Sequence, residues 1–291
     1  MDRDMRDPLP LASRTLYSSA LVTVTDVVCS AGCGGARHEE WCDAATLAFV
    51  RSGTFVRRDR MGRHVADATR VVFFDPAEPY MVDHPVPGGD HCTSLRFDPG
   101  TLREAVRGAA AGRIFGRSTL AGNAELHLAH FRLLAAARSR DPVLVEEIAL
   151  RLLQLCTEDE AGPLRGAAAR RAAALAADAQ VLIAASFSRR VTLEDLSRSL
   201  GVSPFRLCRA FRAANAGTLH QHLTQLRLAA ALERLPAYRH HLTELALEVG
   251  FSSHSHFTHA FREYFGTSPS SLLHRRGLEP AQAAVGARRG R

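Results

Sequence analysis

The side chains best suited to chemistry near the N-terminus are a group of thiols with one imidazole. Cys29, Cys33, His38 and Cys42 lie within 14 residues of one another, and thiolate sulfur and imidazole nitrogen are ligands that zinc prefers. Their spacing matches none of the paired Cys-x-x-Cys patterns of strong zinc motifs. The sequence therefore leaves three interpretations open: ordinary thiols, a zinc or thiol-reactive site, or a redox sensor.

A second set of functional side chains lies in two similar segments near the C-terminus. Residues 192–212 and 242–262 each predict a helix, a turn at Gly201 or Gly250, and a second helix that closes on Ala-Phe-Arg. Tandem helices of this kind place the second helix in a DNA major groove. Two copies about 50 residues apart would allow one chain to contact two successive groove segments.

Local signals mark where these helices begin and end. In the first copy Thr192 and Ser203 stand at N-cap positions, and Gly201 supplies the left-handed residue that ends a helix. The second copy repeats this plan with Thr243 as the first cap, Gly250 as the stop and Ser252 or Ser253 as the second cap. Between the copies, residues 219–235 predict one long helix that would fix their spacing, and Arg227 within it is expected to serve structure more than phosphate binding.

The charge differs between the two halves of the chain. Residues 161–291 hold 18 Arg against 8 acidic side chains, whereas residues 1–160 hold 19 Arg against 22, and lysine is absent. A basic segment joined to a slightly acidic one is typical of a polyanion-binding domain attached to a domain of another function. The alternative for the basic half is an all-α packing unit that contacts no DNA.

The C-terminal third resembles the DNA-binding domain of the AraC/XylS family of bacterial transcription regulators. The residues that carry the resemblance are Leu196, Gly201, Ser203, Leu207, Arg209, Phe211, Arg212, Gly217, Arg227, Leu228, Ala231, Ala246, Gly250, Phe251, Ser255, Phe257, Phe261, Gly266, Ser268 and Pro269.

The resemblance also implies which side chains meet DNA. In the first recognition helix it directs Phe205, Arg206, Cys208 and Arg209 at bases and Arg212 at a phosphate. In the second it assigns the matching roles to His254, Ser255, Thr258 and His259, with Arg262 toward the backbone. Since Arg209 can grip guanine O6 and N7 together, we expect the first unit to supply more base discrimination and the second more positioning.

Residues 1–160 contain short alternating segments typical of an antiparallel sheet. Residues 21–29 and 70–74 predict strands, and residues 46–50 and 53–57 predict a hairpin. The segments FVRSGTF, FFDPAEPY and HPVPGGDHCTSLRF resemble the cupin-like sensor half of the same family, which implies a small antiparallel barrel.

Two amphipathic helices are expected after the strands, at 123–138 and 142–156. In relatives, helices of this kind serve dimerisation. The apolar faces of the two helices carry Leu126, Phe131, Leu134, Leu144, Ile148 and Leu152.

The expected fold is α+β, with an N-terminal cupin-like antiparallel β-barrel and trailing helices, then an all-α DNA-binding domain with two helix-turn-helix units. The expected division is an effector and dimerisation domain at 1–160, a linker at 161–174, the DNA-binding domain at 175–279 and a disordered basic tail at 280–291.

Enzyme activity is not expected in the barrel. A cupin enzyme needs a metal triad, and His38, Glu40 and His84 are the nearest imitation, but the His-x-His of the first motif is replaced by His38-Glu39-Glu40. We therefore predict no catalytic residues. The cofactor is unknown from sequence, with zinc at the four thiol and imidazole residues above as the candidate.

The chain as a whole predicts a sequence-specific transcription regulator. We expect it to be cytoplasmic, because the sequence shows neither a signal peptide nor an apolar stretch long enough to span a membrane. Its expected partners are a double-stranded DNA promoter site, RNA polymerase, a small-molecule effector at the barrel and a second copy of the chain in a homodimer. The alternative is a metal- or thiol-reactive cupin-like sensor or enzyme with a DNA-binding output domain.

Overall fold

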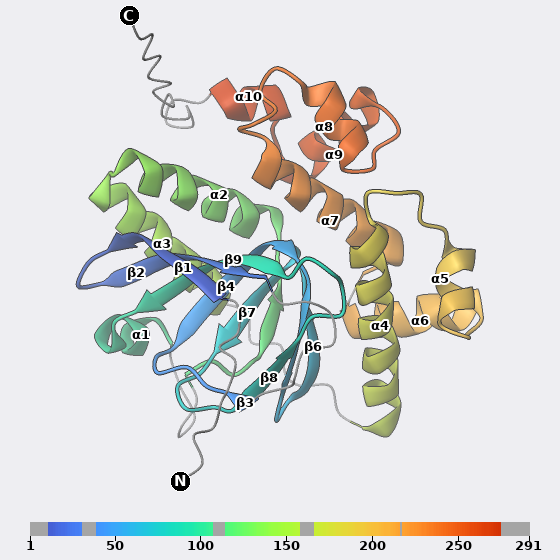
Figure 1. Ribbon diagram of the computed structural model, residues 1–291, viewed down its shortest axis with the longest axis horizontal. Coiled ribbons are helices and arrows are strands. Elements are labelled where there is room, and N and C mark those ends of the chain that lie inside the picture. Colours follow the sequence, from blue (N-terminus) through green and yellow to red (C-terminus); the bar gives the residue numbers. More distant parts are fainter. Residues whose placement is uncertain (1–10, 31–38, 107–113, 158–165, 216, 275–291) are drawn as a thin grey trace, which may run out of the picture.

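The computed structural model describes residues 11–30, 39–106, 114–157, 166–215 and 217–274. Figure 1 shows an N-terminal half built on β-sheets, with helices on one side, and a C-terminal half made of helices. The expected α+β class, with a sheet region first and a helical region second, is confirmed. None of the helices in these ranges is long and apolar enough to cross a membrane.

The described strands of the N-terminal half form two antiparallel sheets. The larger has the strand order β1 (Leu11–Ser18), β2 (Val22–Cys29), β9 (Asp90–Phe97), β4 (Thr46–Gly53), β7 (Arg70–Phe74) and β10 (Thr119–Ala121). The smaller has the order β3 (Glu39–Glu40), β8 (Tyr80–Asp83), β5 (Phe55–Asp59) and β6 (Gly62–Ala66). The hydrogen-bonded ladders of the described strands leave these two sheets separate, so the barrel is not closed.

The hairpin expected around Ser52-Gly53 is wrong. Both predicted strands exist as β4 and β5, but β4 pairs with β7 and β9, whereas β5 pairs with β6 and β8. Only Thr54 separates β4 from β5, and a tight hairpin needs a two-residue turn to reverse the chain. The chain therefore crosses at Thr54 from one sheet to the other instead of folding back.

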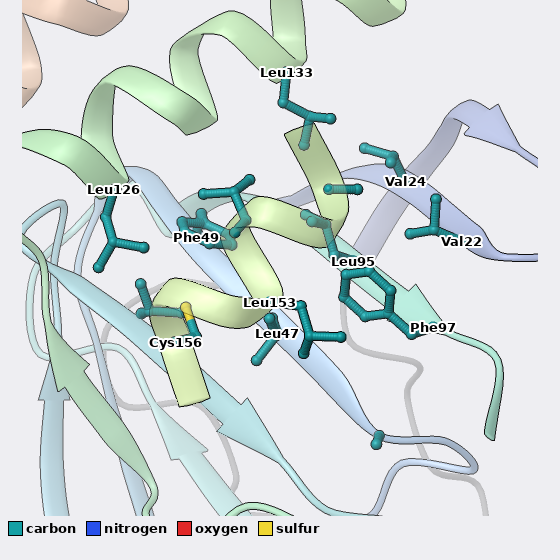
Figure 2. Packing of buried hydrophobic residues seen from close by; sticks show 14 of the residues in the cluster. Val22, Val24, Leu47, Phe49, Leu95, Phe97, Leu126, Leu133, Leu153 and Cys156 are labelled. Carbon is teal, nitrogen blue, oxygen red and sulfur yellow. The ribbon is translucent and has the colours of Figure 1, made fainter. Parts of the chain in front are cut away.

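The main core lies between the larger sheet and the helices that follow it. After α1 (Pro99–Ala105), α2 (Ala124–Ser139) is capped by Asn123, whose side chain accepts from the Leu126 N–H at 2.9 Å. In Figure 2, α2 and α3 (Pro142–Thr157) turn apolar side chains onto the sheet. The labelled residues of this core are Val22, Val24, Leu47, Phe49, Leu95, Phe97, Leu126, Leu133, Leu153 and Cys156.

The apolar residues expected on α2 and α3 are mostly buried within this chain. Leu126 and Leu152 belong to the sheet core, and Leu134 is also buried. Phe131 packs instead among the C-terminal helices. Leu144 differs, because 41% of its surface is exposed. The apolar faces of α2 and α3 therefore mainly stabilise the fold of a single chain rather than a contact with a second chain.

The described residues of the C-terminal half form seven helices. They are α4 (Ala167–Ser186), α5 (Leu193–Ser199), α6 (Pro204–Asn215), α7 (Leu219–Arg234), α8 (Leu242–Glu248), α9 (His254–Phe265) and α10 (Pro269–His274). Helix α4 begins at Ala167, so the latter part of the segment expected to be a linker, 161–174, is helical. The expected disordered tail, 280–291, lies outside the described residues.

Polar contacts join the two halves along α7 and α4. Arg51 of β4 donates from Nε to Glu233 Oε1 of α7 at 2.9 Å, and from Nη1 to Asp26 Oδ1 of β2 at 2.6 Å. Arg63 of β6 donates to Asp178 of α4 at 2.7 Å. Figure 1 shows α4 running beside β6 and α7 lying over the end of the larger sheet. The helical half is thus packed on the sheets through two of its longest helices.

Two buried histidines lie at the same interface. His222 Nε2 of α7 is 3.2 Å from Asp67 Oδ2, and this contact helps to hold the pKa of the Asp67 carboxyl down at about 2, although burial alone would raise it. The ring of His130 on α2 stacks on Phe49 with ring centroids 4.8 Å apart. Burial and the nearby charge of Arg51 lower the pKa of His130 to about 3, so its ring is neutral at neutral pH.

Candidate nucleic-acid interface

The first helix pair, α5 and α6, is formed by the caps that the sequence predicts. Thr192 accepts from the Asp195 N–H at 3.1 Å, and Gly201 has a left-handed φ of 63° between the two helices. Ser203 accepts from the Arg206 N–H at 3.3 Å at the start of α6. The inward side of α6 is buried through Leu207, Ala210 and Phe211, so the opposite side is left for solvent.

That opposite side of α6 carries all five residues expected to meet DNA there. Phe205, Arg206, Cys208, Arg209 and Arg212 are exposed, and 75% of the Phe205 surface is accessible, which is unusual for so large an apolar side chain. The Arg209 guanidinium lies 5.9 Å from the centre of the Phe205 ring. The face therefore combines three cationic side chains with an aromatic one.

These three arginines keep their charge available. Within the described ranges, no carboxylate forms an ion pair with Arg206, Arg209 or Arg212. Arg198 on α5 is different, because it bonds to Glu194 at 2.7 Å and to Asp195 at 3.1 Å. Positive charge is thus concentrated on α6, where an anion such as a phosphate could approach it.

The second pair, α8 and α9, has one cap where the sequence predicts it and one elsewhere. Ser253 accepts from the His256 N–H at 3.1 Å and caps α9. The expected cap at Thr243 is wrong, because α8 already begins at Leu242. The His241 carbonyl accepts the first helical bond, from the Leu245 N–H at 3.0 Å, directly after a turn in which the His241 N–H donates to Tyr238. That turn starts the helix two residues earlier than a cap at Thr243 would, and leaves Thr243 inside it.

The outward side of α9 carries the second expected set with less charge. His254, Ser255, His259 and Arg262 are exposed, and Thr258 is half-buried. His254 Nε2 and Thr258 Oγ1 are 3.3 Å apart, and His259 Nε2 lies 3.8 Å from Glu263 Oε2. Arg262 is the fully charged residue of this set. The two outward faces therefore differ in charge, with three arginines on α6 and one on α9.

Helix α7 sets the position of the two pairs relative to each other. Leu226 and Ala229 pack into the core of the first pair, and Leu228, Ala231 and Leu232 pack into the core of the second. Because neighbouring positions of one helix enter two cores, neither pair can shift without disturbing α7. The outward faces of α6 and α9 are therefore parts of one rigid framework.

Arg227 fastens this framework from the middle of α7. Its Nε donates to the Phe187 carbonyl at 2.7 Å and its Nη2 to the Arg189 carbonyl at 2.8 Å. Burial lowers the pKa of its guanidinium. Both acceptors follow α4, so Arg227 ties the end of that helix to α7, which is the structural role that the sequence favours for it.

The structure describes the surroundings of two of the four residues in the zinc set that the sequence suggests, Cys29 and Cys42. Cys33 and His38 lie outside the described residues. The Cys42 thiol is 3.5 Å from the Tyr80 hydroxyl, and Cys29 lies instead beside His84 and Asp90, with candidate ligand atoms of these three within 4.8 Å of one another. Sequence reasoning missed Asp90 because its neighbours are set by the pairing of β2 with β9, which no local pattern reveals.

Comparison with known proteins finds similarity in the C-terminal half. A family model described as a helix-turn-helix domain matches residues 196–275. The HTH-type transcriptional regulator GlxA of Rhizobium meliloti (strain 1021) is 33% identical over 43% of this chain and 40% of its own length. The HTH-type transcriptional activator AarP of Providencia stuartii is 28% identical over 31% of this chain and 67% of its own length.

Some similar solved structures cover only part of this chain, and others cover nearly all of it. The C-terminal domain of AraT, a response regulator from Geobacillus stearothermophilus, is 26% identical over 41% of this chain and 98% of that domain, with a TM-score of 0.36. ToxT from Vibrio cholerae O395 is 8% identical over 91% of this chain and 97% of its own, with a TM-score of 0.34. The chain thus spans less than half the length of the first curated relative and nearly all of the AraT domain.

The two turn glycines provide a test of the framework. A Cβ at Gly250 (φ 93°) would lie 2.7 Å from the Phe187 oxygen and 2.9 Å from Arg227 Nε, whereas a Cβ at Gly201 (φ 63°) would have no atom within 4 Å. We therefore expect Gly250→Ala to lower the free energy of unfolding by about 2 to 4 kcal/mol, and Gly201→Ala by about 1 kcal/mol from backbone strain alone. Urea unfolding measures both, and equal losses would show that Arg227 and Phe187 do not restrict the second turn.

Proposed function

We propose that this chain, which belongs to the AraC/XylS family through its C-terminal helix-turn-helix domain, is a sequence-specific DNA-binding transcription regulator. The observation that carries the proposal is the pair of exposed faces on α6 and α9, held at a fixed separation by α7. A single rigid frame with two outward helices suits two successive segments of one DNA groove. The alternative of a metal- or thiol-reactive cupin-like enzyme is not favoured, because the curated relatives that match are named as regulators.

We assign the reading of bases mainly to α6. Arg209 and Arg206 are exposed and unpaired by carboxylates of the described residues, and Arg is the side chain best shaped to hold guanine O6 and N7 together. Phe205 and Cys208 are placed to contact bases beside them, and Arg212 to contact a phosphate. On α9, His254, Ser255, Thr258 and His259 face the second groove segment with short or weakly charged groups, so this helix would position the protein more than it discriminates.

Two substitutions distinguish residues that discriminate between bases from residues that position the protein on the DNA backbone. Arg209→Ala should weaken binding to the preferred site by about 1 to 3 kcal/mol and relax the preference at one base pair, because it removes a bidentate contact. Arg262→Ala should weaken all sequences alike and reduce the slope of log K against log salt by about 1, because it removes one phosphate contact. Selection from a random DNA library, followed by titrations at several salt concentrations, measures both effects.

Arg138 supplies the matched control. It is an exposed arginine near the end of α2, so Arg138→Ala removes the same charge from the N-terminal half and should change neither affinity nor preference. If Arg209→Ala behaved like Arg138→Ala, the assignment of base contacts to α6 would be refuted.

We propose that residues 1–160 form the effector and dimerisation domain and residues 175–279 the DNA-binding domain. The contacts of α4 with both α6 and β6 support a joint made of a packed helix rather than a loose tether after residue 167. Signals would then pass between the halves through side-chain contacts such as the bond from Arg51 to Glu233.

We propose that a small organic anion controls the protein from a cavity between the halves. The cavity has a volume of about 450 Å³, and polar residues from both halves line it, among them Arg63, Arg70, Arg117, Ser118, Arg170 and Asn215. Four arginines around one space favour a carboxylate or a phosphate. The Arg117 guanidinium lies 5.9 Å from the Phe73 ring centre, where it can still meet a ligand.

A thermal-shift screen of small carboxylates and phosphates tests the cavity. At least one compound should raise the melting temperature of the chain, and Arg117→Leu should reduce that rise, since ligand binding to the folded state alone stabilises it. Arg138→Ala again serves as the control, and a stabilising anion whose effect survived Arg117→Leu would place the effector elsewhere.

We propose further that the chain acts in the cytoplasm as a homodimer on promoter DNA, with RNA polymerase as its partner. The apolar residues first expected at the dimer contact are mostly buried in the chain. Val143 and Leu144 at the start of α3, with 72% and 41% of their surfaces exposed, are therefore the better candidates for that contact.

In vitro transcription with purified RNA polymerase, with and without the protein, tests the partnership with RNA polymerase, and an unchanged transcript level would argue against it.

Sedimentation velocity tests the dimer. The full chain should sediment as a dimer at micromolar concentration, and the double variant Val143→Glu, Leu144→Glu should sediment as a monomer, because two buried charges would oppose the contact. A chain that remained monomeric at every concentration, or a double variant that remained dimeric, would contradict this arrangement.

A further inference from the structure

We propose that the N-terminal half holds a zinc ion between Cys29, His84 and Asp90, with Cys92 next to it. The proposal goes beyond regulation of transcription and replaces the ligand set suggested by sequence spacing. The candidate ligand atoms of Cys29, His84 and Asp90 all lie within 4.8 Å of one another. They come from three separate strands or strand ends, so the fold itself gathers them.

The pairing of strands places each ligand. Cys29, the last residue of β2, stands directly opposite Asp90, the first residue of β9, and residues opposite one another on antiparallel strands have Cβ atoms about 5 Å apart. His84 directly follows β8, and the chain returns from it to Asp90 through residues 85–89. Gly89 packs so closely on β2 that a Cβ there would lie 1.8 Å from the Cys29 carbonyl oxygen. The backbone around the cluster is therefore fixed before any ion binds.

The polar atoms already point toward one another. His84 Nε2 is 2.6 Å from Asp90 Oδ1, and the Cys92 thiol donates to Asp90 Oδ2 at 3.0 Å. Zinc bonds to nitrogen, oxygen and sulfur measure about 2.0 to 2.3 Å, which puts tetrahedral ligands about 3.3 to 3.8 Å apart. Side-chain shifts of about 1 Å would thus bring Cys29, His84 and Asp90 to bonding distance. Cys92 lies where it can complete four-coordination or hold the outer oxygen of Asp90.

The donor set and its burial select zinc over harder ions. The His84 and Asp90 side chains are 6% and 9% exposed, and Cys29 and Cys92 are buried as well. Thiolate and imidazole ligands suit zinc, whereas magnesium and calcium require oxygen ligands. On binding, the Cys29 thiol would lose its proton to solvent and bond through the thiolate.

The first experiment measures metal content and coordination in the full chain. Protein purified without added chelator should contain about one zinc ion per chain by mass spectrometry, and protein stripped with a chelator should recover that amount from zinc sulfate. Replacement with Co²⁺ should give the near-ultraviolet thiolate-to-metal band and strong visible bands of a tetrahedral site. Zinc should raise the melting temperature of the stripped protein, because binding energy at such a site is also folding energy.

Four variants decide which residues bind the ion. Cys29→Ser should weaken the thiolate-to-cobalt band, and Cys29→Ser and the near-isosteric changes His84→Gln and Asp90→Asn should each reduce zinc retention at least tenfold. Cys42→Ser removes a nearby thiol that contacts Tyr80 instead and should keep the full metal content.

The proposal is overturned if the stripped chain takes up no zinc, or if Cys29→Ser, His84→Gln and Asp90→Asn all retain it. Loss of zinc on Cys42→Ser with retention on His84→Gln would also overturn it, in favour of the set suggested by sequence spacing. Circular dichroism shows whether each variant is folded, and if one ligand variant unfolds, the other two give the answer.

Discussion

The architecture depends on one helix whose residues are divided between two hydrophobic cores. Leu226 and Ala229 of α7 complete the core of α5 and α6, while Leu228, Ala231 and Leu232 complete that of α8 and α9. Neither helix pair is large enough to bury a core of its own. Each therefore obtains its stability from α7, and the same contacts that stabilise the pairs fix the separation of α6 and α9. Stability and recognition geometry are consequences of the same packing.

The N-terminal half contacts that same helix, which places it where it could influence the proposed DNA binding. Arg51 bonds to Glu233, Asp67 contacts His222, and Phe131 of α2 packs in the core that α7 shares with α9. A neutral His130 lies beside Arg51, where a second positive charge would be unfavourable. A change in the sheets would therefore reach α7 through packed or charged neighbours, without any need for a flexible tether.

A structural feature can be predicted from the sequence when the interaction that forms it joins residues close together in the chain. Thr192, Ser203 and Ser253 cap helices by bonding to backbone groups three residues away, so spacing alone predicts them. The hairpin expected at Ser52-Gly53 fails because alternation identifies a strand but not its partner. Thr243 fails for a related reason, since the turn that ends at His241 decides where α8 begins. Asp90 was not foreseen at all, because only the pairing of β2 with β9 brings it opposite Cys29.

The same strand that brings Asp90 to Cys29 also connects that cluster to α7. Successive residues of a strand point to opposite faces, so Asp90 turns toward Cys29 and His84 while His91 turns the other way. His91 Nε2 is 2.6 Å from Asp26 Oδ1, and Asp26 in turn accepts from Arg51, which bonds to Glu233 of α7. An ion that drew Asp90 inward would therefore act on β9 one residue away from the chain of polar contacts that reaches α7 in the helical half. Two adjacent residues of β9, Asp90 and His91, thus connect the proposed zinc site to α7, the helix that sets the separation of α6 and α9.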